Sequence, residues 1–162
     1  ILNLPTYLAS EHAFTLITQC AGRSGRDREQ GHVILQTYTP ENFVIQTAAR
    51  QDYEAFYTQE IQFRKLLGYP PFMKLLKISC FGKEYRAVSE KAARVYAWLR
   101  RETRQVDSLQ ITPPYDEAIK KKRDTYYISI LIKGEDLAPL KQKIRQSFIL
   151  QENGIIIDVD PL

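Results

Sequence analysis

Two arginines lie three residues apart, each directly after a glycine, in a segment that reads Gln19-Cys20-Ala21-Gly22-Arg23-Ser24-Gly25-Arg26. Glycine permits tight backbone geometry, and the planar guanidinium group matches the shape of a phosphate. A turn of this kind can bring both guanidinium groups to one anion, as an arginine finger does. In phosphoryl transfer such an arginine neutralises charge that develops on the γ-phosphate, which is worth roughly 10³–10⁵ in rate. A solvated basic loop is the alternative interpretation of the same spacing.

A second basic cluster, Lys120-Lys121-Lys122-Arg123, lies where a hairpin between two strands is expected. A basic hairpin can straddle phosphates and give an affinity that depends on salt and not on sequence. Tyr126 and Tyr127 follow in the next strand, where one of them faces the core and the other faces the open side of the sheet. We interpret the cluster and Tyr126 as candidate DNA contacts, with stacking on a base as the role of the tyrosine. An exposed polar turn and ordinary packing are the alternatives.

The elements expected before residue 68 are helices around one strand. Ser10 predicts the N-cap of a helix from Glu11 to about residue 21 that ends at Gly22. The β-branched run Val33–Tyr38 predicts a buried strand. Helices are expected at 41–50 and 52–67, and Gly68 is expected to end the second of them. The extended stretch 69–72 then predicts a domain boundary.

A regular pattern follows that boundary. Strands are expected at 74–81, near 117–122, at 126–133 and at 155–159, with helices at 84–104 and 135–148. The order is β-α-β-β-α-β, which predicts a four-stranded antiparallel sheet with both helices on one face, the ferredoxin-like fold. The fold class is therefore α+β for this part of the chain.

Composition limits the class of protein. The 162 residues include 44% hydrophobic residues, enough for a core, and carry a net charge of +4. Residues 1–50 are neutral, so the remainder carries the whole excess, which suits a polyanion partner. Cys20 and Cys80 are far apart and lack neighbouring ligands, so neither a metal site nor a disulfide is indicated. With no long apolar stretch, we expect a cytoplasmic protein without a membrane partner, and a polyanion partner such as DNA would make it nucleoid-associated.

Several stretches together resemble one family. The pattern Gln19, Gly22-Arg23, Gly25-Arg26 is similar to motif VI of superfamily 2 helicases. With its flanks, the chain resembles the primosomal protein N′ (PriA) family nearly end to end. The further matching stretches are Leu2–Pro5, Ala9–Glu11, Gly31–Pro40, Asp52–Tyr57, Glu60-Ile61, Arg64, Gly68–Phe72 and Asp158–Pro161. Because the only methionine is Met73, we also expect a piece cut from a longer protein.

The resemblance implies an architecture and an activity. Residues 1–50 would be the end of a second RecA-like motor lobe, in an α/β fold, 51–71 a helical linker and 72–162 the ferredoxin-like C-terminal domain. The family is an ATP-dependent 3′-to-5′ DNA helicase that recognises stalled replication forks and helps to reload the replicative helicase. Carried onto this chain, Arg26 is the first choice for the γ-phosphate contact and Arg23 the second. Gln19 would couple the nucleotide state to DNA contact.

Cofactors and partners come from the same resemblance. ATP with Mg²⁺ and structural Zn²⁺ are implied for the parent protein. This sequence has no GxxxxGK[ST] loop or paired CxxC site, so no cofactor and no activity are expected of the fragment alone. The implied partners are forked DNA, other primosome proteins and the C-terminal tail of single-stranded DNA-binding protein. Lys141 and Arg145, one helical turn apart, are the candidates for holding that acidic, hydrophobic tail.

Two other classes of protein also fit these residues. One is a stand-alone ferredoxin-like module that binds RNA or DNA, although no aromatic RNP-type strand is present. The other is a protein-interaction domain whose basic charge is incidental. The family hypothesis differs from both in requiring an ATP-binding half elsewhere in the protein.

Overall fold

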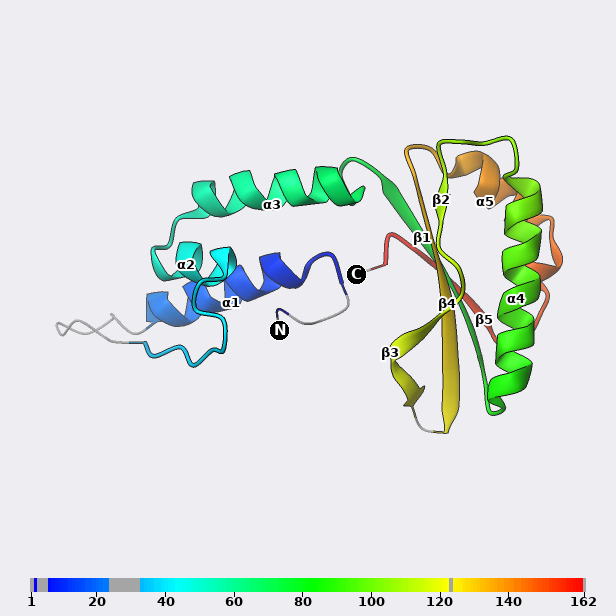
Figure 1. Cartoon of the computed structure of the whole chain (residues 1–162), viewed down its shortest axis with the longest axis horizontal. Helices are drawn as coiled ribbons and strands as arrows, with labels where there is room; N and C mark the ends of the chain where they lie inside the picture. Colours follow the sequence, from blue (N-terminus) through cyan, green and yellow to red (C-terminus); the bar gives the residue numbers. More distant parts are fainter. Residues whose placement is uncertain (1, 3–5, 24–32, 123, 162) are drawn as a thin grey trace. The chain divides into compact units, whose positions relative to one another are not determined.

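The computed structural model of the chain describes residues 2, 6–23, 33–122 and 124–161, apart from the side chains of 118–122. Two units follow one another along the chain, the first ending at Leu67 and the second spanning Gly68–Pro161. Figure 1 shows helices α1 to α3 in the first unit and the sheet with its helices in the second. Each unit has a hydrophobic core of its own.

Three helices make up the described part of the first unit: α1 (Ala9–Arg23), α2 (Phe43–Ala49) and α3 (Tyr53–Leu67). Asn42 caps α2, because its Oδ1 accepts a hydrogen bond of 2.9 Å from the Val44 amide. Phe14 of α1 stacks on Phe56 of α3 with ring centroids 4.4 Å apart. Helix α3 contributes Phe56 to this core and belongs to the first unit.

Two expectations for this unit are wrong. Helix α1 begins at Ala9, so Ser10 lies inside its first turn, and the helix continues through Gly22 to Arg23. A single glycine costs a helix only about 1 kcal/mol, which is too little to end it. Val33–Tyr38 is not a strand, and Ile34 and Tyr38 are fully exposed. A strand needs a neighbour for its backbone hydrogen bonds, and the described part of the first unit contains none.

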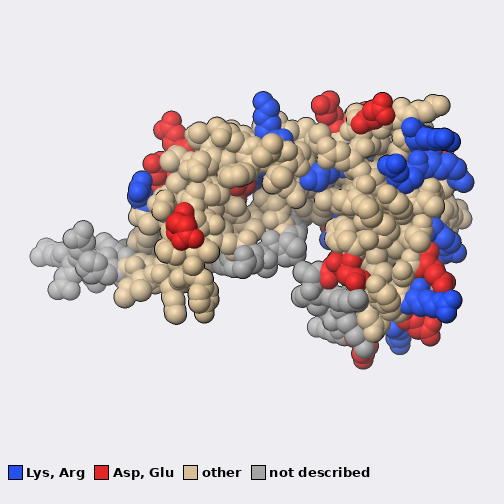
Figure 2. Space-filling view, in the orientation of Figure 1, with Lys and Arg blue, Asp and Glu red and all other residues tan. Residues whose placement is uncertain are grey.

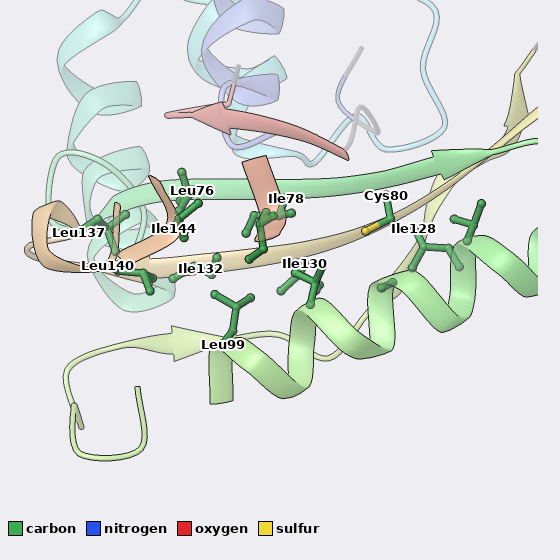
Figure 3. Close-up of a cluster of buried hydrophobic side chains, with 14 residues drawn as sticks. Leu76, Ile78, Cys80, Leu99, Ile128, Ile130, Ile132, Leu137, Leu140 and Ile144 are labelled. Atoms are coloured by element: carbon green, nitrogen blue, oxygen red, sulfur yellow. The ribbon is translucent and has the colours of Figure 1, made fainter. Parts of the chain in front are cut away.

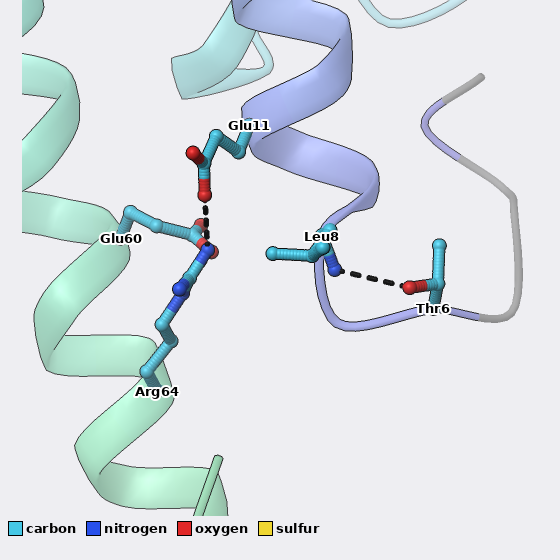
Figure 4. A network of polar contacts seen from close by, with 5 residues as sticks. All are labelled: Thr6, Leu8, Glu11, Glu60 and Arg64. Atoms are coloured by element: carbon cyan, nitrogen blue, oxygen red, sulfur yellow. Dashed lines mark hydrogen bonds and ion pairs between the residues drawn. The ribbon is translucent and has the colours of Figure 1, made fainter. Parts of the chain in front are cut away.

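One ion-pair network fastens α1 to α3 (Figure 4). Arg64 Nε lies 2.9 Å from Glu60 Oε1 within α3, and Arg64 Nη2 lies 2.9 Å from Glu11 Oε2 on α1. The side chains of Arg64 and Glu60 are only 14% and 10% exposed. Burial alone would lower the pKa of Arg64, but the hydrogen bonds and charges of the two carboxylates outweigh it and raise that pKa. Arg64 therefore compensates a carboxylate that would otherwise be buried without a partner.

An antiparallel sheet forms the second unit. Its strands are β1 (Lys74–Gly82), β2 (Gln110–Ile111), β3 (Tyr115–Lys122), β4 (Thr125–Gly134) and β5 (Ile155–Val159). The order across the sheet is β3–β4–β1–β5, and the short β2 also pairs with β4. The helices are α4 (Tyr85–Glu102) and α5 (Ala138–Arg145), and a 3-10 turn η1 covers Phe148–Leu150.

Both helices cover the same face of the sheet. Ile78 of β1 and Ile130 of β4 are register partners, and both are fully buried beneath α4 and α5 (Figure 3). The helices contribute the apolar stripe at intervals of three and four residues that the sequence predicts. That stripe consists of Val88, Ala92, Val95 and Leu99 on α4 and Leu140 and Ile144 on α5. Burial also raises the pKa of the Cys80 thiol to about 11, so Cys80 acts here as a small apolar residue.

The antiparallel sheet and the one-sided helix layer confirm a small α+β unit. The observed α5 is shorter than the expected helix 135–148, because Leu137 precedes its first turn and Ser147 caps the separate turn η1. Gly68 adopts a positive φ of 61° directly after α3, as expected for a glycine that ends a helix. Nothing in the described residues shows a RecA-like lobe, since strands occur only in the second unit.

Asp160 joins the end of β5 to the start of β1 through two hydrogen bonds with Leu75. Its backbone N–H donates to the Leu75 carbonyl at 2.9 Å, and its Oδ1 accepts from the Leu75 N–H at 3.0 Å. The residue adopts a φ of 52°, a left-handed conformation that aspartate tolerates better than most residues. Asp160, one of the two acidic residues in the terminal stretch Asp158–Pro161, thus has a structural role in this fold.

Replacing Arg64 by alanine is expected to destabilise the first unit by about 2 kcal/mol, because Glu60 then stays buried without its partner. Native-state hydrogen exchange of α1 and α3 amides measures this. Arg86→Ala is the matched control, since Arg86 and Glu90 form the same i,i+4 pair at 93% and 65% exposure. That control should change exchange in α4 by no more than about 0.5 kcal/mol. Equal effects of the two substitutions would contradict the role assigned to Arg64.

Candidate nucleic-acid interface

The residues of the arginine motif lie at the end of α1. Gln19 and Arg23 are both exposed and one helical turn apart, so they lie on the same side of the helix. Arg26 lies outside the described residues. The structure therefore brings together two of the three residues that the sequence singles out.

The basic cluster lies on the hairpin formed by β3 and β4. Lys121 and Lys122 of β3 pair with Tyr126 and Thr125 of β4, and Asp124 in the turn between them has a positive φ of 60°. Arg123 lies outside the described residues, as do the side chains of Lys120–Lys122. The backbone thus confirms a hairpin at this position, with the basic residues at its tip.

The pairing of this hairpin is irregular. The register passes from Asp116–Ile128 to Lys121–Tyr126, so residues 117–120 stand opposite Tyr127 alone. Extra residues of this kind bend a strand and change where the side chains beyond them point. Lys120 lies in the irregular stretch itself.

Tyr126 and Tyr127 face opposite sides of the sheet. Tyr126 packs against the hydrophobic core and meets the Tyr85 ring edge-on at 5.6 Å between centroids. Tyr127 lies on the open face, where it stacks on its register partner Phe81 at 5.8 Å. Of the two tyrosines, Tyr126 has the packing role, and Tyr127 is the one placed beside the open face.

A polar cluster lies at the centre of that open face. Ser79 and Ser129 are register partners, are buried, and lie with their hydroxyl oxygens 2.7 Å apart. Ser129 Oγ donates to Glu117 Oε1 at 2.6 Å, and Ser79 Oγ is 3.3 Å from the same oxygen. Lys77 Nζ lies 3.6 Å from Glu117 Oε1. We refer to Ser79, Ser129, Glu117 and Lys77 as the serine–glutamate cluster.

The comparisons with known proteins agree with one another. Residues 65–162, which include the hairpin and the serine–glutamate cluster, match the family described as the primosomal protein N C-terminal domain. The chain belongs to this family. Relatives named replication restart protein PriA are 37% identical in Chlamydia pneumoniae, 36% in Synechocystis sp. and 30% in Bacillus subtilis. These matches cover 98–100% of this chain but only 20–22% of each relative, so the chain spans about a fifth of their length.

The part matched to the PriA C-terminal family coincides closely with the second unit. Membership in this family favours the primosomal interpretation of the sequence. It argues against a stand-alone RNA- or DNA-binding module and against an interaction domain with incidental charge. In the described residues no helix is long and apolar enough to cross a membrane. No group of three His, Cys, Asp or Glu residues could hold a metal there, so the described part of the chain offers no zinc site.

The helix face of this PriA-family domain is rich in basic residues. Together α4 and α5 carry eight Lys or Arg residues and two Glu residues. Figure 2 shows Lys and Arg side chains gathered over the side of the second unit where these helices lie. Lys141 is half-buried and Arg145 is exposed, one turn apart on α5. They are thus placed on one side of that helix, as the sequence predicts.

Tyr69, Tyr115 and Lys133 lie together at another part of the open face. Lys133 Nζ is 3.7 Å from the centroid of the Tyr69 ring, a cation–π contact. Burial lowers the pKa of Lys133. Burial also raises the pKa of Tyr115, and the nearby Glu117 and Tyr69 raise it further.

The sequence interpretation missed the serine–glutamate cluster and the Phe81–Tyr127 pair. A signal for both was present, because Lys77, Ser79 and Phe81 alternate with the apolar residues of β1. Alternation assigns these side chains to one face, but it does not say which strand lies beside them.

Tyr115 is expected to titrate above the ordinary tyrosine value near 10, and Glu117→Gln should lower the pKa of Tyr115 without fully restoring that value, because burial remains. The folded state favours the neutral phenol of Tyr115. The stabilisation from this group is therefore complete below the ordinary pKa and is lost as the pH rises through the higher pKa of the folded state. Carbon-13 NMR of labelled tyrosines measures this, with Tyr115→Phe to assign the signal. An unchanged pKa in the glutamine variant would show that Glu117 does not act on Tyr115.

Proposed function

We propose that the chain is the C-terminal part of an ATP-dependent 3′-to-5′ DNA helicase that acts at stalled replication forks. In this proposal the second unit contacts DNA, and the fragment alone neither hydrolyses ATP nor unwinds DNA. The observation that carries the proposal is the match of residues 65–162 to the primosomal protein N C-terminal domain. The name of the relatives, replication restart protein, supports the biological role.

The β3–β4 hairpin is the DNA contact that we propose. Its lysines and Arg123 would approach phosphate oxygens, which supplies affinity without reading sequence. The rings of Phe81 and Tyr127 stack on each other beside this hairpin. Tyr127 stands opposite residues 117–120, which directly precede the tip. An aromatic surface next to a basic one suits the bases and backbone of a single strand. The stacking role proposed from sequence for Tyr126 therefore passes to Tyr127.

The first unit would contribute to nucleotide hydrolysis. Arg23 and Arg26 would neutralise charge on the phosphates of ATP bound with Mg²⁺, and Gln19 would relay the nucleotide state toward DNA. ATP supplies the transferred γ-phosphoryl group when bound. Gln19 and Arg23 fit such a role in being exposed together at the end of α1. The remaining ATP-binding residues and the zinc sites would have to come from parts of the protein that this chain does not contain.

Protein partners are part of the same proposal. Lys141 and Arg145 would receive the acidic, apolar C-terminal tail of single-stranded DNA-binding protein, and other primosome proteins would bind elsewhere. The support is charge, since the observed α5 has three basic residues and no acidic one. Two basic residues one turn apart can hold one carboxylate each.

Removing the hairpin lysines tests the DNA contact. The triple variant K120Q/K121Q/K122Q should weaken binding of forked DNA about 10-fold or more at low salt. Its plot of log Kd against log salt concentration should lose up to about 2.7 units of slope, because each of the three phosphate contacts contributes about 0.9. The control R100Q/R101Q/R104Q removes the same charge from the last turn of α4 and the turn that follows it, and should keep most of the affinity and of the salt slope. If the two triple variants weaken binding equally, general basicity explains it and the hairpin assignment is wrong.

The nucleotide role is tested in the full-length protein. Arg26→Ala should abolish DNA-stimulated ATP hydrolysis, a loss of roughly 10³-fold or more, while DNA binding changes by less than about 2-fold. Phosphate release and fluorescence anisotropy with forked DNA measure the two properties on the same preparation. Arg28→Ala, two residues further along, is the control for a non-specific effect of removing charge. Retained hydrolysis in the Arg26 variant would contradict the assignment.

A further inference from the structure

Glu117 is an acidic residue that lies just before the basic tip of the hairpin and points back into the sheet. It is the first residue of the irregular stretch 117–120, which stands opposite Tyr127. Its carboxylate accepts a hydrogen bond from the fully buried hydroxyl of Ser129. The same carboxylate lies beside Lys77. A carboxylate near a DNA-binding surface repels phosphate, so attraction for DNA gives no reason for its position.

The hydrogen bonds of the cluster form a directed chain. Each serine hydroxyl has one proton to donate. Ser129 uses its proton toward Glu117 at 2.6 Å, so Ser79 donates either to Ser129 at 2.7 Å or to the same Glu117 oxygen at 3.3 Å, and the shorter distance favours Ser129. This arrangement joins β1, β4 and β3 through side chains on the open face. It connects the edge strand to the two central strands at the point where regular backbone pairing stops.

We propose that Glu117 is a positioning residue for DNA binding, which holds the irregular part of β3 on Ser129 and Ser79 and so aims the basic tip. The inference rests on the proposed DNA contact of the hairpin. An edge strand with extra unpaired residues has few backbone hydrogen bonds to fix it, so a side-chain anchor decides where its tip points. A buried hydroxyl donating to a carboxylate is a strong and directional anchor. The charge of Glu117 costs some attraction for phosphate, and its hydrogen bonds offset this by positioning the tip.

Two substitutions at one position separate charge from hydrogen bonding. Glu117→Gln and Glu117→Ala both remove the negative charge, but the glutamine keeps an oxygen that can accept from Ser129. We expect Glu117→Ala to weaken binding of forked DNA about 5-fold and to lose about one unit of the salt slope, since fewer phosphates are reached. Glu117→Gln should stay within about 2-fold of the unaltered chain or bind more tightly. Equal affinities of the two variants would overturn the proposal, because charge alone would then explain the result.

Two further variants keep the test decisive. The double variant S79A/S129A removes both donors without a change of charge and should weaken binding like Glu117→Ala. It carries the test if the alanine variant fails to fold, which Trp98 fluorescence reports from the second unit. Glu135→Ala removes an exposed carboxylate at the other end of β4 and should leave the affinity within about 2-fold. Unaltered binding by the double serine variant would also overturn the proposal.

Hydrogen exchange distinguishes this inference from the proposed function. Amides of residues 118–125 should exchange faster in Glu117→Ala and in the double serine variant than in Glu117→Gln, whether or not DNA is present. If these amides respond but the unaltered chain does not bind forked DNA, the proposed function fails and the positioning role fails with it. If the chain binds DNA through its hairpin but the amides do not respond, only the inference about Glu117 is overturned.

Discussion

The register between β1 and β4 is the constraint on which the second unit depends. It places Ile78 opposite Ile130 on the helix-covered face and Ser79 opposite Ser129 on the open face. Because side chains alternate along a strand, a slip by one residue would move the serines beneath α4 and expose the isoleucines. Burial of the apolar core therefore stabilises the strand pairing that brings the hydroxyl groups of Ser79 and Ser129 together. The same register positions the hairpin at the start of β4.

The elements that local patterns dictate were predictable. The alternation in Lys74–Gly82 and the three- and four-residue spacing in α4 identify a strand and a helix without knowledge of their neighbours. The order of these elements then leaves few topologies, and the antiparallel sheet with a one-sided helix layer is one of them. The serine–glutamate cluster was not predictable in this way, because Ser79 and Ser129 are 50 residues apart and meet only through the register. Nor does the sequence reveal that Glu117 falls where regular pairing stops.

The failed predictions have the same physical origin. Val33–Tyr38 has the composition of a strand, but composition cannot supply a neighbouring strand, and in the described residues the segment stays exposed. Ser10 lies in the first turn of α1 and does not cap it, because the helix already begins at Ala9. The preference of a serine for the cap position is worth only about 1 kcal/mol. Thr6 precedes the helix, and its hydroxyl accepts from the Leu8 amide. Preferences of this size set the position of a helix end only when nothing else competes.

Charge by itself says little about the interface. The chain has 23 basic and 19 acidic residues, and several of the described ones form ion pairs, such as Arg86 with Glu90 and Arg94 with Glu152. What distinguishes one basic group from another is how its backbone is held. On α4 and α5 the helices fix the basic residues, whereas the hairpin tip extends beyond the irregular pairing of β3. A flexible tip would lose conformational entropy on binding phosphate, and that loss would reduce its affinity. Fastening the strand just before the tip lowers this cost, which is why an acidic side chain can favour the binding of an anion it repels.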